Sequence, residues 1–230
     1  MRYHHHQTTT GIQAARREAT SISNCVVSNV DAPLGVADDE AAIVAFGWAD
    51  VEIRDVLTHD SQRALLTYDH RVNTFANGQP VPKKNVYVRG LHNYGFANIN
   101  DHPNKGELLI IHGWPAHKFP DASGYGTVRL HTIGGVKNSM WLSIWKAEID
   151  ELLIHDANVR AIDIGVQRPI RKMYISDLTA ERVIIRMMDG FQVDHIGDWH
   201  LDDKYVYELH DQRNGERFPN ETYVGEFDTP

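Results

Sequence analysis

Val183-Ile-Ile-Arg-Met-Met-Asp-Gly-Phe-Gln-Val193 carries the strongest β-sheet pattern in this chain. Val183, Ile185 and Met187 would share one face of an extended strand, because successive side chains of a strand alternate between its faces. Asp189-Gly190 follows directly and suits a two-residue turn whose central positions need positive φ. The stretch therefore predicts a β-hairpin, in which neighbouring strands run in opposite directions.

Similar turn signals recur along the chain, each between runs of apolar or β-branched residues: Asn77-Gly78, Gly134-Gly135 and Asn214-Gly215. Further strands are predicted at 42–48, 51–57, 162–166 and 205–209, with another through Cys25-Val-Val. Together these patterns indicate a predominantly antiparallel sheet that ends in a C-terminal β-meander.

Residues 140–155 predict the main helix. Trp141, Trp145, Ile149 and Leu152 recur at helical spacing, and Ser139 is a candidate N-cap. A single amphipathic helix beside a sheet usually buries its apolar side, so we expect the tryptophans to face the core. The resulting fold class is α+β.

The N-terminal part of the chain, residues 1–35, is expected to form an extended arm with one short helical pattern at 12–21. Residues 36–230 are expected to form a single α+β domain. No repeat of fixed period and no Gly/Ser linker is visible, so the sequence offers no further domain boundary.

Composition bounds the function. The chain has 230 residues, 42% hydrophobic and 23% charged, with a formal net charge of -8. This charge argues against general binding of nucleic acids or anionic membranes, whose phosphates attract Lys and Arg. Arg168, Arg171 and Lys172 form the densest basic cluster, and we expect them to lie on a solvated surface.

Cys25 is the single cysteine, which excludes an intrachain disulfide and cysteine-based metal clusters. We expect it to pack in the core. The opening residues contain no apolar signal region, and no stretch is long enough to span a bilayer. The expected location is therefore cytoplasmic or within a virion.

Residues 192–203 crowd imidazoles and carboxylates together. If they form a metal centre, His195, His200, Asp198 and Asp202 are its candidate ligands for a divalent cation. On one regular strand these side chains would point to both faces, so a joint site requires a turn at Gly197. The favoured interpretation is an ordinary loop with Asp side chains bonded to backbone amides, and hence no metal or other cofactor.

Asp194-His195-Ile196, Gly197-Asp198 and Leu201-Asp202-Asp203 resemble the signature of phage-type HNH endonucleases. The resemblance implies that His195 is the general base and Asp194 a metal ligand. One residue is missing between Ile196 and Gly197, and Asp203 stands where that family has Asn. A strand rather than a helix is predicted afterwards.

Gly106-Glu-Leu-Leu-Ile-Ile-His-Gly-Trp-Pro115 resembles the strand and oxyanion turn of α/β-hydrolases. That family presents its nucleophile on a Gly-x-Ser-x-Gly elbow, and none occurs in this chain. The preferred interpretation is a buried strand that ends at His112, followed by a turn.

No complete catalytic constellation or phosphate-binding loop is visible in the sequence. We therefore expect a non-enzymatic assembly protein that forms a homo-oligomeric particle, such as a phage head, neck or tail, whose partners are its own copies and other assembly subunits. One alternative is a metal-dependent hydrolase or HNH-like nuclease centred on 194–203. Another is a sheet-based module for a ligand or glycan, with Trp48, Trp114 or Trp199 as stacking platforms.

Overall fold

The structure is a computed structural model. The residues that it describes are 2–4, 10–14, 19–28, 41–59, 61, 63–94, 107–135, 141–166, 168, 170–180, 182–187, 206–211 and 221–223.

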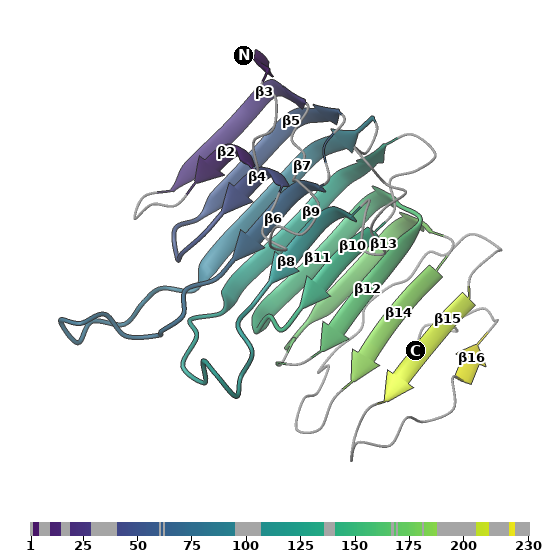
Figure 1. Cartoon of the computed structure of the whole chain (residues 1–230). Helices are drawn as coiled ribbons and strands as arrows, with labels where there is room; N and C mark the ends of the chain where they lie inside the picture. Colours follow the sequence, from purple (N-terminus) through teal and green to yellow (C-terminus); the bar gives the residue numbers. More distant parts are fainter. Residues whose placement is uncertain are drawn as a thin grey trace.

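The described strands form two sheets that lie face to face (Figure 1). The seven-stranded sheet contains, in spatial order, β1 (Arg2–His4), β3 (Thr20–Ser28), β5 (Val51–His59), β7 (Lys84–Asn93), β9 (Tyr125–Gly135), β11 (Ile149–Asn158) and β13 (Met173–Thr179). The nine-stranded sheet contains β16 (Glu221–Tyr223), β15 (Val206–Asp211), β14 (Arg182–Met187), β12 (Ala161–Val166), β10 (Trp141–Trp145), β8 (Glu107–His112), β6 (Arg63–Tyr68), β4 (Ala41–Ala45) and β2 (Thr10–Ala14).

The chain winds as a parallel β-helix. It alternates between the sheets, from β4 to β5, then β6 to β7, then β8 to β9, so that each strand from β3 to β14 lies beside the strand two places earlier. The neighbours run parallel, with the single antiparallel pair between β15 and β16 among the strands described. Each coil thus forms its backbone hydrogen bonds with the coils before and after it.

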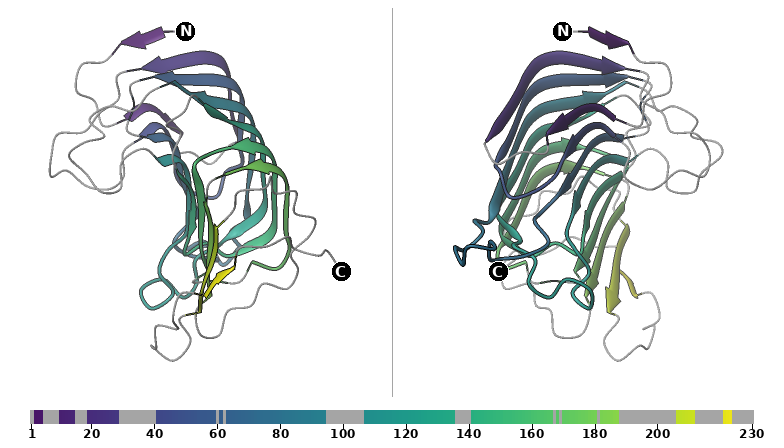
Figure 2. Two further views of the ribbon diagram at one scale, coloured as in Figure 1. Left: turned by 90° about the vertical axis from the view of Figure 1, so that its right-hand side faces the viewer. Right: turned by 60° about the vertical axis from the view of Figure 1, so that its left-hand side comes forward.

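Every full-length strand of the seven-stranded sheet bends sharply at one residue (Figure 2). The strand register aligns these residues in one column, and each has a positive φ. Asn, Asp and Gly adopt this left-handed conformation at lower cost than other residues, and five of the six positions carry one of them. The column consists of Asn24, Asp55, Gly90, Thr132, Asp156 and Asp177.

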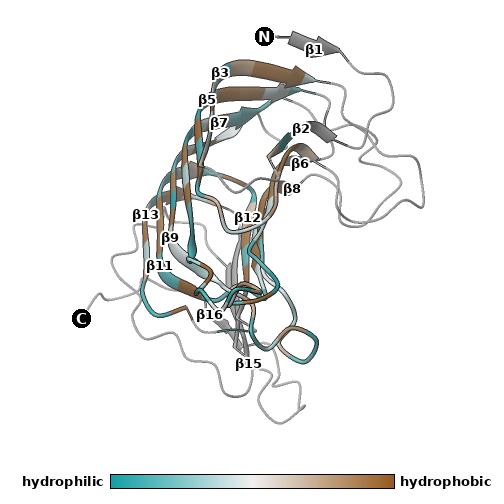
Figure 3. Ribbon diagram, turned by 90° about the vertical axis from the view of Figure 1, so that its left-hand side faces the viewer, coloured by the Kyte–Doolittle hydropathy of each residue, from teal (hydrophilic) through white to brown (hydrophobic). Residues whose placement is uncertain are grey.

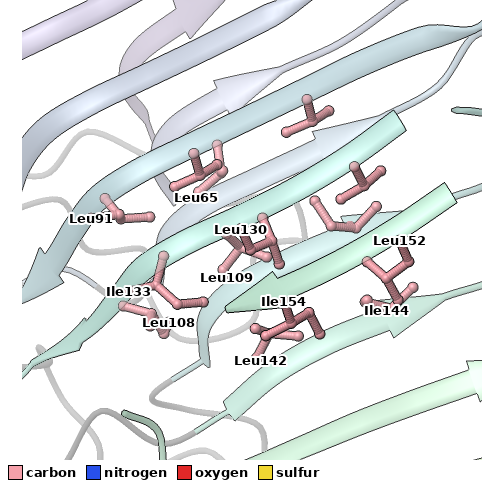
Figure 4. Close-up of a cluster of buried hydrophobic side chains, with 14 of the residues drawn as sticks. Leu65, Leu91, Leu108, Leu109, Leu130, Ile133, Leu142, Ile144, Leu152 and Ile154 are labelled. Atoms are coloured by element: carbon pink, nitrogen blue, oxygen red, sulfur yellow. The ribbon is translucent and has the colours of Figure 1, made fainter. Parts of the chain in front are cut away.

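The core fills the space between the two sheets with aliphatic side chains. Leu130 of β9 is fully buried between its register partners Val88 and Ile154 of the neighbouring coils, and faces Leu109 of the opposite sheet (Figure 4). Hydropathy alternates along the bent strands (Figure 3), and their apolar residues are buried in the core. This interior seam extends through the successive coils.

The nine-stranded sheet is apolar on both faces around β4, β6 and β8. Ile43 and Leu65 face the interior, whereas Val44 and Leu66 belong to a second buried cluster together with Ile110. Parallel strands that are buried on both faces consist of nearly continuous apolar runs. The all-buried strands β4 and β6 fit this pattern.

The predicted α+β class with an antiparallel sheet is wrong, because the described residues form two sheets of mainly parallel strands and contain no helix. Of the predicted helix 140–155, the described residues 141–155 form strand β10, a turn at Lys146 with φ of 55°, and the first part of β11. Leu142 and Ile144 of β10 point into the core, which fits a two-residue period. Residue Ser139 lies outside the described part.

The hairpin predicted at 183–193 is also wrong, because β14 pairs in parallel with both β12 and β15. Gly134-Gly135 lies within β9, whereas Gly78 does occupy a turn with φ of 79°. Residues 189–190 and 214–215 lie outside the described part of the chain. Apart from residue 19, the described residues within 12–21 belong to β2 and β3. The predicted short helix is therefore not found among them.

The positions of the strands were predicted better than their directions. The strands expected at 42–48, 51–57, 162–166 and 205–209 correspond to β4, β5, β12 and β15. Strand β8 ends at His112, as expected. Residues of the predicted arm supply β1, β2 and β3 to the two sheets. In the described part of the chain, no helix has the length and apolar character required to cross a membrane.

The bend column can be tested by replacing its glycine. Gly90 has φ of 72°, and a Cβ there would lie 2.7 Å from Asp55 Oδ1 and within 3.3 Å of Asp55 backbone atoms. Gly90→Ala should lower the free energy of unfolding by about 1–3 kcal/mol, measured by urea denaturation. Asn24→Gly, at an exposed position of the same column, should change it much less. Equal stability of Gly90→Ala and wild type would contradict this account of the bend.

Candidate functional site

A groove lies on the outer surface of the seven-stranded sheet, across β5, β7 and β9. Its volume is about 440 Å³. We call it the arginine groove and define it by its lining residues, which are Glu52, Ile53, Arg54, Tyr87, Val88, Arg89, Arg129 and His131. These strands lie side by side in the middle of the β-helix (Figure 1).

Strand register brings the polar residues of the groove into two rows. In one row Glu52 is paired with Tyr87, and Tyr87 with Arg129. In the other row Arg54 is paired with Arg89, and Arg89 with His131. Paired residues on neighbouring strands lie about 4.8 Å apart, so each row presents closely spaced side chains along the long axis of the molecule.

The groove is locally basic although the chain is acidic overall. Three arginines line it, against one glutamate. Glu52 accepts hydrogen bonds from both Nε and Nη2 of Arg54, so the charges of these two side chains offset each other. Arg89 and Arg129 have no hydrogen-bonding or ion-pair partner in the described part of the chain, and both are exposed. Two guanidinium groups are therefore available to an anion.

The second row continues beyond the groove with His155 and Ser176. His155 is the register partner of His131, and Ser176 is the partner of His155. Ser176 Oγ and Asp177 Oδ2 lie 2.8 Å and 2.9 Å from the same atom, His155 Nδ1. A Ser-His-Asp relay needs the hydroxyl and the carboxylate on different ring nitrogens, so this arrangement is not a catalytic triad.

A buried polar cluster lies inside the β-helix, where β4 and β6 end. Lys84 is fully buried, and its Nζ donates hydrogen bonds to the carbonyl oxygens of Ala45 (2.8 Å) and Tyr68 (3.1 Å). Burial lowers the pKa of Lys84 to about 7. Tyr125, its register partner, places its hydroxyl 2.8 Å from His112 O. These contacts satisfy carbonyl groups at the ends of successive strands.

Asp69 belongs to the same cluster. It is 2% exposed, and its Oδ2 accepts a hydrogen bond from the Gly124 backbone N–H at 2.8 Å. Burial raises the pKa of Asp69 to about 7, although the bond to Gly124 and the charges of Arg168 and Lys84 act in the opposite direction. Burial of Tyr125, together with the nearby charge of Asp69, raises the pKa of Tyr125 far above its usual value. Asp69, Lys84 and Tyr125 do not line the arginine groove, and we assign the cluster a structural role.

The two described tryptophans proposed as stacking platforms are already packed against other rings. Trp48 contacts Phe75 edge-on, with ring centroids 4.8 Å apart. The ring centroids of Trp114 and Tyr68 are 5.0 Å apart, and the Arg71 guanidinium lies over the Trp114 ring, 4.2 Å from its centroid. Trp199 lies outside the described residues. Neither Trp48 nor Trp114 lines the arginine groove.

The sequence-based site at 192–203 lies outside the described residues, including Asp194, His195, Asp198, His200 and Asp202. The proposals that these residues bind a divalent cation or act as an HNH-like nuclease therefore stay predictions. Within the described part of the chain, no group of three or more His, Cys, Asp or Glu side chains could hold a metal ion.

Two other expectations can be compared with the structure. Cys25 packs against the core as expected, and burial raises the pKa of its thiol. Arg168 is only 4% exposed, contrary to the expected solvated surface, and donates from Nε to Trp114 O at 2.9 Å. It holds the turn after β8, while Arg171 forms an ion pair with Asp150 (3.1 Å).

Sequence reasoning missed the arginine groove. Its residues are separated by long stretches of sequence, and only the parallel register brings them together. The sequence carried one signal for it, because each arginine occupies a polar position in a strand whose apolar and polar residues alternate. Comparisons with protein families, with curated proteins and with solved structures find no match for this chain.

The buried cluster makes a prediction about pH. Asp69 binds its proton more tightly in the folded state, so its contribution to stability falls as pH rises from 3.8 towards 7. Lys84 binds its proton less tightly in the folded state, so its contribution rises again between 7 and 10.5. The pair should therefore be least stabilising near pH 7.

Urea denaturation of wild type and of the double variant Asp69→Asn/Lys84→Met tests this prediction. The difference between their free energies of unfolding should fall and then rise with pH, with its minimum near the pKa values of about 7. A difference that stays constant from acidic to alkaline pH would show that both groups keep their ordinary titration.

Proposed function

We propose that this protein binds an acidic oligosaccharide in the arginine groove. The observation that carries the proposal is a pair of exposed arginines without ion-pair partners in the described chain, Arg89 and Arg129, beside an exposed tyrosine in one groove. Guanidinium groups bind carboxylates and sulfates through paired, charge-assisted hydrogen bonds.

The register of the arginines supports an anionic ligand. Arg54 and Arg89 occupy directly paired positions on β5 and β7. Like charges that face each other across neighbouring strands destabilise a sheet by a few tenths of a kcal/mol to about 1 kcal/mol. Glu52 offsets this repulsion in part by pairing with Arg54. A bound anion would offset the rest, which gives the arrangement a functional explanation.

Tyr87 supports a sugar as the carrier of the anionic groups. It is 37% exposed, and its register neighbours are Glu52 and Arg129. An aromatic ring provides an apolar face for the C–H groups of a pyranose, and its hydroxyl provides a polar edge. A ring beside two guanidinium groups thus matches a uronic or sulfated sugar better than a small inorganic anion.

The groove suits binding better than hydrolysis. Glycoside hydrolysis ordinarily uses two carboxyl groups on opposite sides of the scissile bond. Glu52 is the single carboxylate among the lining residues, and Arg54 already holds it. The net charge of -8 also disfavours nucleic acid, because a long polyanion would meet repulsion beyond the groove.

Substitution of the two available arginines tests the function. Arg89→Gln and Arg129→Gln should each weaken binding of tetragalacturonate about tenfold in calorimetry, as expected for loss of about 1.4 kcal/mol each. Lys118→Gln removes a charge from an exposed turn outside the groove and should leave binding unchanged.

Dextran sulfate, neutral dextran and single-stranded DNA complete the comparison. The sulfated polymer should compete with tetragalacturonate, and the neutral polymer should not. Unchanged affinity in the double variant Arg89→Gln/Arg129→Gln, or tighter binding of DNA than of either acidic sugar, would refute the proposal.

Assembly into a homo-oligomeric particle, such as a phage head, neck or tail, is a second candidate function. One observation favours it. Strand β13 ends the seven-stranded sheet and pairs with β11 on one side, with no strand on its other side among the described residues. An unpaired strand edge offers backbone groups to another chain.

Light scattering coupled to size-exclusion chromatography tests this second candidate. Self-association through strand edges should raise the molar mass with protein concentration. A strictly monomeric mass at high concentration would remove the assembly function, whatever the result of the sugar experiments.

A further inference from the structure

Two histidines lie side by side at the end of the arginine groove. His131 of β9 and His155 of β11 are register partners, and their ring centroids are 4.8 Å apart at an interplanar angle of 46°. His155 keeps 45% of its side chain exposed. The pair is therefore accessible from solvent.

Hydrogen bonds determine which nitrogen of His131 carries the proton. The Thr132 hydroxyl donates to Asp156 Oδ2 at 2.9 Å, which uses its single hydrogen. Its oxygen lies 2.7 Å from His131 Nδ1, so the remaining hydrogen bond requires Nδ1–H as the donor. The neutral His131 ring then has an unprotonated Nε2 with a free lone pair.

The same tautomer follows for His155 from a different contact. Asp177 Oδ2 lies 2.9 Å from His155 Nδ1, and a carboxylate only accepts hydrogen bonds. Nδ1–H must therefore be the donor, with Ser176 Oγ as a further neighbour at 2.8 Å. The neutral His155 ring also has an unprotonated Nε2.

Both rings are held on the same side, at the column of bend residues. Thr132 and Asp177 belong to this column, so both Nδ1 atoms face it, and Nε2 lies on the opposite edge of each ring. Histidines that ligate metals commonly donate their other N–H to a carboxylate, which fixes ring orientation and raises basicity. His155 does so directly, and His131 does so through Thr132.

We propose that Nε2 of His131 and Nε2 of His155 together bind one transition-metal ion of the Zn²⁺, Ni²⁺ or Cu²⁺ type. Neutral imidazole nitrogens suit these ions, whereas Mg²⁺ and Ca²⁺ prefer oxygen ligands. The pair supplies two ligands, and water or an anionic group fills the remaining positions. The proposal is independent of sugar binding.

Nearby charges partly balance around the pair. Arg89 is the register partner of His131, and Arg129 is the register partner of Tyr87. The positive charges of both arginines disfavour a cation. Asp156 and Asp177 face the two rings through the contacts described above and favour it. We therefore expect a site of moderate affinity, with each aspartate contributing through ring orientation and charge.

Zinc titration of the full chain by calorimetry, near pH 7.5 where imidazole is mostly neutral, tests the site. The run His4 to His6 could itself bind metal, so the reference protein carries alanine at these three positions. His131→Gln or His155→Gln should remove one equivalent of zinc or weaken it at least tenfold. His92→Gln, on neighbouring β7, is the matched control and should have no effect.

Asp177→Asn keeps both nitrogen ligands and should weaken zinc about tenfold, as carboxylate partners of ligating histidines typically do. Circular dichroism checks that each variant is folded. Long-range ¹H–¹⁵N spectra of the metal-free protein should show Nδ1–H at both histidines. Zinc uptake that is the same in both Gln variants, or an Nε2–H tautomer at either ring, would overturn the proposal.

Discussion

The structure depends on one constraint, which is that each coil must form its backbone hydrogen bonds in register with the coils beside it. A parallel ladder leaves no freedom to shift one strand without exposing its apolar side chains. Inward residues such as Leu91, Leu130 and Ile154 therefore stack into one continuous core. The same register aligns the outward residues, so the arginine groove is a direct result of coil stacking.

Two polar side chains of the interior bond to the ends of strands. The Lys84 amine and the Tyr125 hydroxyl occupy paired positions and bond to carbonyl oxygens of β4, β6 and β8. Buried carbonyl groups without partners would cost about 1–3 kcal/mol each. The shifted pKa values of Lys84 and Asp69 are the cost of placing ionisable groups in that position.

The sequence located many strands but not their partners. The apolar residues that identify a strand, such as Leu108-Leu-Ile-Ile111, show where the strand lies but do not by themselves name its partner. The nearly continuous apolar runs of β4 and β8 were the signal for a parallel sheet. Loops of unequal length between coils hide the repeat, which appears only as the irregularly spaced bend residues. Trp141, Trp145 and Ile149 matched a helix because the break at Lys146 was not recognised.

The groove was unpredictable for a related reason, since Glu52, Arg89 and Arg129 belong to three different coils. The two outward rows have a further geometric consequence. Their side chains repeat at the separation of parallel strands, about 4.8 Å, so the surface acts as a molecular ruler along the long axis. A flexible chain laid along this surface would meet equivalent backbone positions at equal intervals. The side chains at those positions would then decide which part of the chain binds at each one.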